Sequence, residues 1–136
     1  MATPVAAPVV AQELMALDTA DQIRAYTAVG RLELNGKGFC TATLISTDLV
    51  LTAAHCLFEK GSETRVPLDG LTFNAGLRHG RAEATRQVRR VAIHAQYRTG
   101  DDDPVTSVST DLALVELDHP IRNGRITPLM VVRYRR

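Results

Sequence analysis

The sequence has few aromatic residues, almost no net charge and only two cysteines. Phenylalanine and tyrosine together make up 4% of the 136 residues, and tryptophan is absent. A surface for stacking bases or sugars is therefore not expected. Basic residues number 16 and acidic residues 15, which leaves a net charge of +1. Because proteins dedicated to nucleic acid usually carry a basic excess over the whole domain, we expect no nucleic-acid partner.

Long apolar runs and a basic N-terminus are also missing. No apolar run approaches the roughly 20 residues needed to cross a bilayer, so we expect no membrane span. The first basic residue is Arg24, so the N-terminus lacks the charged start of a secretory signal. The remaining composition, 45% hydrophobic and 23% charged, is typical of one globular domain.

Three regions differ in character along the chain. Residues 1–25 are rich in Ala, Pro and Val, with a short helical pattern at 11–17, and we expect a flexible or partly helical extension. Residues 26–130 alternate short β-like runs with turns, which predicts an all-β fold, a small antiparallel barrel or sandwich. Residues 131–136 form a basic tail. The expected strands are Val29–Leu34, Phe39–Ser46, Leu49–Thr52, Leu71–Ala75, Thr85–His94 and Leu112–Leu117.

Six arginines crowd the stretch between residues 78 and 98. A nucleic-acid-binding strand is one interpretation of this stretch, but acidic residues compensate the charge and aromatic residues are missing. We favour a barrel strand that turns its arginines outward and Val88, Val91 and Ile93 inward, in partial alternation.

The most informative segment, Gly38–Leu57, reads GFCTATLISTDLVLTAAHCL. Ala53 and Ala54 are small enough to let the chain turn sharply out of a strand and present His55 at the rim of a sheet. A general base needs such a rigid position, open to substrate and with its imidazole orientation fixed. Taken alone, His55 fits a structural or surface histidine better than a catalytic one.

As a whole, this segment resembles the histidine region of the chymotrypsin/trypsin-like serine peptidases. In that family a cysteine begins one strand, an apolar hairpin follows, and Leu-Thr-Ala-Ala-His-Cys ends it. The resemblance implies a six-stranded antiparallel barrel, the first of two barrels, with His55 as general base and a disulfide between Cys40 and Cys56. Such a bond stabilises a fold by roughly 3 kcal/mol. A zinc site of the same three residues is an alternative, although adjacent His and Cys lack the usual ligand spacing.

A second match, Ser109–Leu117, resembles the family's aspartate region, where an Asp opens an apolar strand. The resemblance implies that Asp111 accepts a hydrogen bond from His55, fixes its tautomer and stabilises the imidazolium. The alternative is that Asp111 only begins a strand, which suits aspartate well. The chain order of the two motifs, histidine before aspartate, is that of the family and favours the catalytic interpretation.

Weaker matches extend the resemblance to about residues 28–130. Phe73–Gly76 is similar to a strand of bacterial members, and Val91–Tyr97 to a segment that ends in Tyr and in which we interpret the histidine, His94, as structural. Ile126–Leu129 resembles the stretch before the connection between the two barrels. Asp101–Asp103 suggests calcium, but the segment lacks alternating ligands and a closing Glu, so we expect a solvated loop.

The family's nucleophile lies in a Gly-Asp-Ser-Gly-Gly segment, and the sequence contains none. We therefore expect a trypsin-like serine endopeptidase represented by its first barrel, inactive alone because the serine and oxyanion hole belong to the second. Thr27–Gly30 departs from the family's Ile-Val-Gly-Gly start. The implied partners are a protein or peptide substrate and the second barrel, without a cofactor, in a secreted or periplasmic setting. The alternative is a non-enzymatic protease homologue that acts as a binding module.

Overall fold

The computed structural model describes residues 27–60, 62–77, 79–99 and 104–132. The predicted extension over residues 1–25 and the predicted loop at Asp101–Asp103 lie outside these ranges, as does most of the basic tail.

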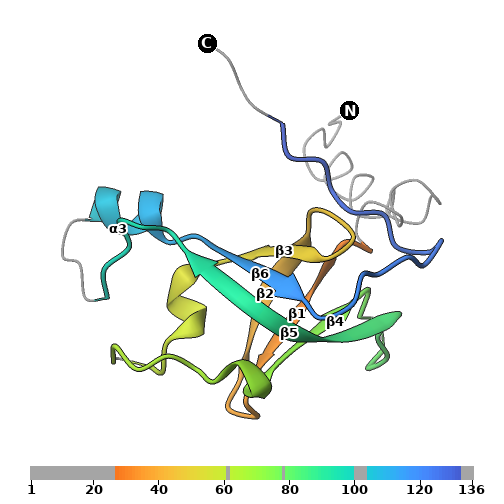
Figure 1. Ribbon diagram of the computed structural model, residues 1–136, viewed down its shortest axis with the longest axis horizontal. Helices are drawn as coiled ribbons and strands as arrows, with labels where there is room; N and C mark the ends of the chain where they lie inside the picture. Colours follow the sequence, from red (N-terminus) through yellow and green to blue (C-terminus); the bar gives the residue numbers. More distant parts are fainter. Residues whose placement is uncertain (1–26, 61, 78, 100–103, 133–136) are drawn as a thin grey trace, which may run out of the picture.

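Six antiparallel strands close into a barrel in the order β1-β2-β3-β6-β5-β4 (Figure 1). This confirms the all-β fold and the barrel rather than the sandwich. The strands are β1 (Val29–Leu34), β2 (Phe39–Leu44), β3 (Leu49–Thr52), β4 (Leu71–Ala75), β5 (Ala84–Ile93) and β6 (Ala113–Leu117).

The barrel closes through two pairings between strands that are not consecutive in the sequence, β1 with β4 and β3 with β6. β1 pairs with β2 and with β4, and β6 pairs with β5 and with β3. At Gly30 a side chain would collide with the carbonyl of Asn74 and press on the ring of Phe73, so glycine lets β1 and β4 approach. The tight turn after β1 is built on Asn35 and Gly36, whose φ angles are +55° and +75°, as the Asn-Gly pair predicts.

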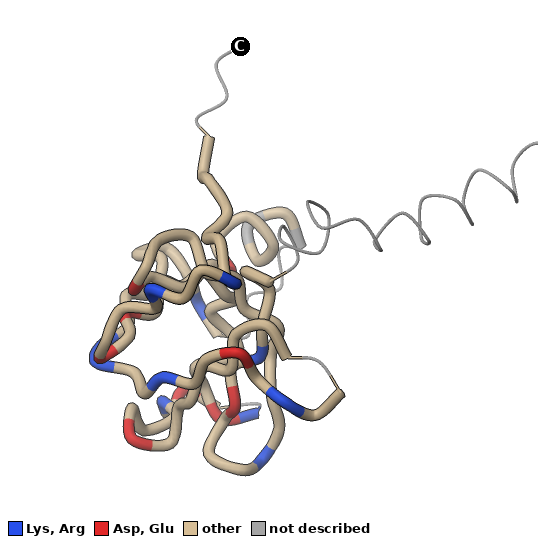
Figure 2. Tube along the Cα trace, turned by 90° about the vertical axis from the view of Figure 1, so that its right-hand side faces the viewer, with Lys and Arg blue, Asp and Glu red and all other residues tan. Residues whose placement is uncertain are grey.

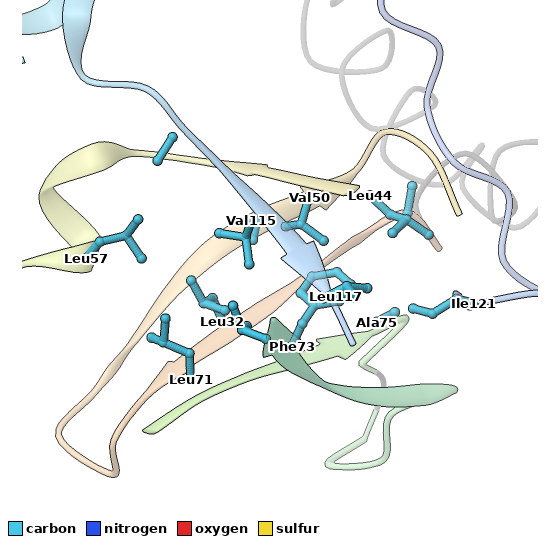
Figure 3. Packing of buried hydrophobic residues seen from close by; sticks show 14 of the residues in the cluster. Leu32, Leu44, Val50, Leu57, Leu71, Phe73, Ala75, Val115, Leu117 and Ile121 are labelled. Atoms are coloured by element: carbon cyan, nitrogen blue, oxygen red, sulfur yellow. The ribbon is translucent and has the colours of Figure 1, made fainter. Parts of the chain in front are cut away.

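Alternate residues of the strands point inward and form one core (Figure 3). Phe73 is fully buried, with the side chains of Leu32 and Leu117 near its ring (Figure 3). After β6, Ile121 and Ile126 are also buried, so the chain returns across one end of the barrel rather than leaving it.

In the arginine-rich strand β5 the charged side chains point outward, as predicted. Val88 is buried and the side chains of Val91 and Ile93 pack against the core. These inward positions are not in simple alternation, because a β-bulge between Val88 and Arg90 shifts the register against β6. Arg89 and Arg90 both pair with Glu116, at 3.6 and 3.0 Å. These two arginines therefore form ion pairs that link β5 to β6 on the outside of the barrel.

Three short helices were not predicted from the sequence. They are the 3₁₀ helices η2 (Ala54–Leu57) and η3 (Leu68–Gly70) and the α-helix α3 (Pro104–Thr110). His55 lies within η2, and Asp111 directly follows α3. Among the described residues, no helix has the length and apolar character required to cross a membrane.

Candidate active site

The two candidate catalytic residues come from neighbouring strand ends. In the β3–β6 ladder Thr52, the last residue of β3, lies opposite Ala113, the first residue of β6. His55 follows Thr52 by three residues and Asp111 precedes Ala113 by two. Pairing of β3 with β6 therefore brings together two side chains that are 56 positions apart in the sequence.

The turn that carries His55 is anchored to the barrel by its buried neighbours. Thr52 is buried, and its hydroxyl donates a hydrogen bond to the carbonyl of Thr41 on β2 at 3.0 Å. Ala54 is fully buried at the start of η2, where a larger side chain would meet the core, and Leu57 anchors the other end of the same turn. His55 between them is turned outward, with 64% of its side chain exposed. The small residues thus act as the sequence predicts.

Asp111 binds His55 through both carboxylate oxygens. Oδ1 accepts a hydrogen bond from the backbone N–H of His55 at 2.8 Å, and Oδ2 lies 2.6 Å from its Nδ1. The carboxylate is 23% exposed and follows the buried Thr110. The contact of Oδ1 holds the backbone of the turn, and the contact of Oδ2 holds the imidazole ring of His55. The two residues are therefore held together more firmly than by a single side-chain contact.

The contact also defines which imidazole nitrogen is free. A carboxylate only accepts hydrogen bonds, so in a neutral His55 the proton resides on Nδ1, facing Asp111. Nε2 then carries the lone pair. The geometry is that of a general base whose tautomer is set by its neighbour.

A second His–Asp contact in the chain shows why proximity alone is insufficient. His119 Nδ1 lies 3.3 Å from Asp118 Oδ2, but the two residues are adjacent in the sequence and the histidine is 76% exposed. In the described part of the chain, the Asp118 carboxylate accepts no hydrogen bond from the backbone N–H of His119. His119 lies just beyond the end of β6, whereas Asp111 lies just before its start.

The predicted disulfide is present. Cys40 on β2 and Cys56 on η2 are bonded, with their Cα atoms 6.3 Å apart, and the bond ties the His55 turn back to the barrel. The donor atoms of these cysteines and His55 lie within 4.8 Å of one another, as a metal site would require. Both sulfurs are nevertheless bonded to each other, so neither is a thiolate free to bind zinc, and the zinc alternative is wrong for the disulfide-bonded chain.

An aromatic pair beside His55 was not recognised from the sequence. The rings of Phe58 and Tyr97 lie 5.6 Å apart and, with His55 and Thr99, line a hollow of about 450 Å³. Burial raises the pKa of Tyr97 above its ordinary 10.0, and the negative charge of Asp111 raises it further. The only sequence signal for it was the family-like segment that ends at Tyr97.

A groove of about 570 Å³ extends from His55 on the side of the disulfide. Its walls come from the β1–β2 hairpin and from the segment after η2. The apolar residues lining it are Leu34, Phe39, Phe58 and Val66, and the charged ones are Lys37, Glu59 and Lys60.

Two further polar residues, His94 from the sequence analysis and Ser62, which lines the same hollow as His55, have local structural contacts. The imidazole of His94 accepts a hydrogen bond from the N–H of Gln96, which supports the structural interpretation. The hydroxyl of Ser62, which lies near His55, donates to the carbonyl of Glu59 and accepts from the N–H of Thr64. It is therefore engaged in a turn rather than presented to the histidine.

A closed β-barrel that presents an oriented His–Asp pair on a disulfide-bonded turn is the arrangement expected of the chymotrypsin/trypsin-like serine peptidases. Comparison with known proteins agrees. The family model described as Trypsin matches residues 19–133, and the chain belongs to the trypsin family.

Curated relatives support the same family. The chain is 33% identical to human Granzyme M over 100 residues, 37% identical to the Serine protease filzig of Drosophila melanogaster over 100 residues, and 34% identical to a Trypsin of Phaedon cochleariae over 84 residues. These alignments cover 72%, 72% and 61% of this chain but only 34%, 5% and 29% of the three relatives. The bacterial type suggested by Phe73–Gly76 stays a prediction.

Proposed function

We propose that the chain supplies the general base and its orienting carboxylate to a trypsin-like serine endopeptidase. The observation that carries the proposal is the double contact of Asp111 with His55, at 2.8 and 2.6 Å, which leaves Nε2 as the free nitrogen. The serine comes from a second barrel with a Gly-Asp-Ser-Gly segment, which the printed sequence does not contain.

In the proposed reaction the serine oxygen attacks the carbonyl carbon of a peptide bond while its proton passes to Nε2 of His55. Asp111 stabilises the imidazolium across the 2.6 Å contact without taking the proton. The imidazolium then protonates the departing amine, and water, deprotonated in the same way, hydrolyses the acyl-enzyme. The oxyanion hole belongs to the second barrel, so this chain alone is expected to be inactive.

The substrate is a protein or peptide, and the groove beside His55 receives part of it. Phe39 and Phe58 are among the apolar residues that line this groove, together with the disulfide-bonded Cys40 and Cys56. Because structural disulfides are kept in oxidising compartments, the Cys40–Cys56 bond supports a secreted or periplasmic setting.

The test is reconstitution of the catalytic site. The chain is combined with the second barrel of a trypsin-family relative, and ester and peptide turnover are measured. The isolated chain should give background rates and the pair should give measurable hydrolysis. His55→Ala should abolish that activity, and Asp111→Asn should lower kcat by about 10⁴-fold, because the wrong tautomer faces the serine.

His119→Ala is the matched control, since it removes an exposed histidine that also contacts an aspartate. It should leave turnover unchanged. If the reconstituted activity is indifferent to His55→Ala, or if a tight two-barrel complex has no activity at all, the catalytic assignment is wrong. Such a result would favour the alternative, a non-enzymatic binding module.

A further inference from the structure

The turn between β4 and β5 forms a hollow unconnected with the candidate active site. It measures about 570 Å³ and is lined by Gly76, His79, Arg81, Ala82, Glu83 and Arg125. In the β1–β4 ladder the Gly30–Ala75 end leads into this turn, whereas the Leu34–Leu71 end adjoins the groove beside His55. The two sites therefore lie at opposite ends of β1, with the β4–β5 turn on the right of Figure 1 and α3 on the left.

Of the basic residues that line this hollow, Arg125 pairs with Glu83, whereas Arg81 and His79 have no such partner within the described ranges. The side chain of Arg81 is exposed and makes no hydrogen bond or ion pair within the described ranges, and neither does that of His79. The arginines of β5 differ, because Arg86 donates to the carbonyl of Pro120 and Arg90 pairs with Glu116. The guanidinium donors of Arg81, which lines the hollow, therefore have no partner among the described residues.

One carboxylate already binds at the edge of the hollow. Arg125 lies 3.6 Å from Glu83, and the backbone N–H of Arg125 is held by the side chain of Asn123 at 2.9 Å. Two arginines and an imidazole face a single carboxylate, so a positive charge is left over. A guanidinium binds carboxylates in a forked geometry and is weakly hydrated, which makes it suited to such a partner.

The backbone around the hollow is held in an uncommon conformation. His79 and Gly80 have φ angles of +53° and +77°, and a left-handed histidine is disfavoured relative to glycine. Gly76, at +61°, leaves room for the side chain of Glu83, which a Cβ would meet at 3.1 Å. The turn therefore keeps Glu83 near Arg125 while His79 and Arg81 remain free.

We propose that this hollow is a docking site for a short acidic segment of a partner protein, whose carboxylates are bound by Arg81 and Arg125. Charge complementarity selects the occupant. Seen from this end of the barrel, Lys and Arg are interspersed with Asp and Glu along the trace (Figure 2). The positive charge is thus local, which suits one or two carboxylates rather than the extended phosphate chain of a nucleic acid.

The probe is a fluorescein-labelled hexaglutamate peptide, and its binding to the full chain is followed by fluorescence anisotropy at about 50 mM salt, where screening is weak. Hexaglutamine is the uncharged control. Saturable binding of hexaglutamate should weaken about fivefold in Arg81→Gln, the upper size expected for an exposed charge pair. Lys60→Gln removes the same charge from the opposite end of the barrel and should change the affinity less than twofold.

The proposal is overturned if hexaglutamate does not saturate, if hexaglutamine binds equally well, or if both charge-removing variants weaken binding equally. It is also overturned if inorganic sulfate, at equal charge concentration, displaces the peptide and binds with the same dependence on Arg81, because the site would then be one for small oxyanions. Amide chemical-shift mapping on the unmodified chain gives a readout that needs no variant. Shifts should appear at Gly76, Gly80 and Ala82, and shifts confined to the groove beside His55 would refute the site.

Discussion

Removal of the Cys40–Cys56 disulfide has an effect whose size follows from the structure. The bond joins positions 16 residues apart in the sequence and links β2 to η2. In the chain-entropy treatment, a cross-link over such a loop lowers the entropy of the unfolded chain by about 10 cal/mol/K, which corresponds to about 3 kcal/mol at 25 °C. Without the bond, the free energy of unfolding should fall by that amount, and Tm by more than about 10 °C.

Urea unfolding followed by far-UV circular dichroism provides the assay. Three samples are compared: the oxidised chain, the chain reduced by a dithiol, and the variant Cys40→Ala/Cys56→Ala. The reduced chain and the variant should unfold together. Their urea m-value should be larger than that of the oxidised chain, because the unfolded state without the cross-link exposes more surface.

The reasoning is refuted if the reduced chain loses less than about 1 kcal/mol, since a loop of this length then contributes little entropy. A variant that is much less stable than the reduced chain would show that packing of the half-cystines matters more than the cross-link. Cys56 is 4% exposed, so such a packing contribution is the natural competitor.

Two further predictions concern Tyr97 and Gly30. The raised pKa of Tyr97 means that the folded state holds the phenolic proton more tightly than the unfolded state, so stability is lost as the pH rises above 10.0 through the folded pKa. Tyr97→Phe should flatten that loss in urea unfolding between pH 9 and 11, about one unit either side of the ordinary tyrosine pKa, and an unchanged slope would contradict it. Gly30→Ala should cost about 2 kcal/mol or more, because its Cβ meets the Asn74 carbonyl and the Phe73 ring. Gly124→Ala, which meets nothing within 4 Å, is the control, and equal losses in both would refute the argument.

The strands were predictable from the sequence because their signals are local. Three of the six strands begin and end at the predicted residues, and β2, β5 and β6 differ by one or two positions. The Asn35–Gly36 turn is likewise specified by two residues that tolerate positive φ. The bulge at Val88–Arg90 was not predicted, since it depends on how β5 is paired with β6.

The candidate active site also combines features that local sequence predicts with features that depend on strand pairing. Ala53 to Cys56 form a compact motif, so the outward position of His55 could be predicted. The contact of Asp111 with the backbone N–H of His55 could not, because it depends on the distance between two strand ends in the closed barrel. The Phe58–Tyr97 pair also joins distant segments, and although Tyr97 ends a family-like segment, nothing in the sequence indicates that Phe58 is its partner.

The contact between His55 and Asp111 depends on the pairing of β3 with β6. β1, β2 and β3 form two successive hairpins, and β4 and β5 add to the sheet on the other side of β1. The last strand of the chain, β6, then closes the barrel by pairing with β3. His55 and Asp111 lie at one end of that last seam. A barrel whose seam has opened keeps most of its strands and its disulfide but has no oriented base. Native-state hydrogen exchange at the amides of β3 and β6 would then measure the fraction of molecules in which the His55–Asp111 pair is formed, separately from the fraction that are folded.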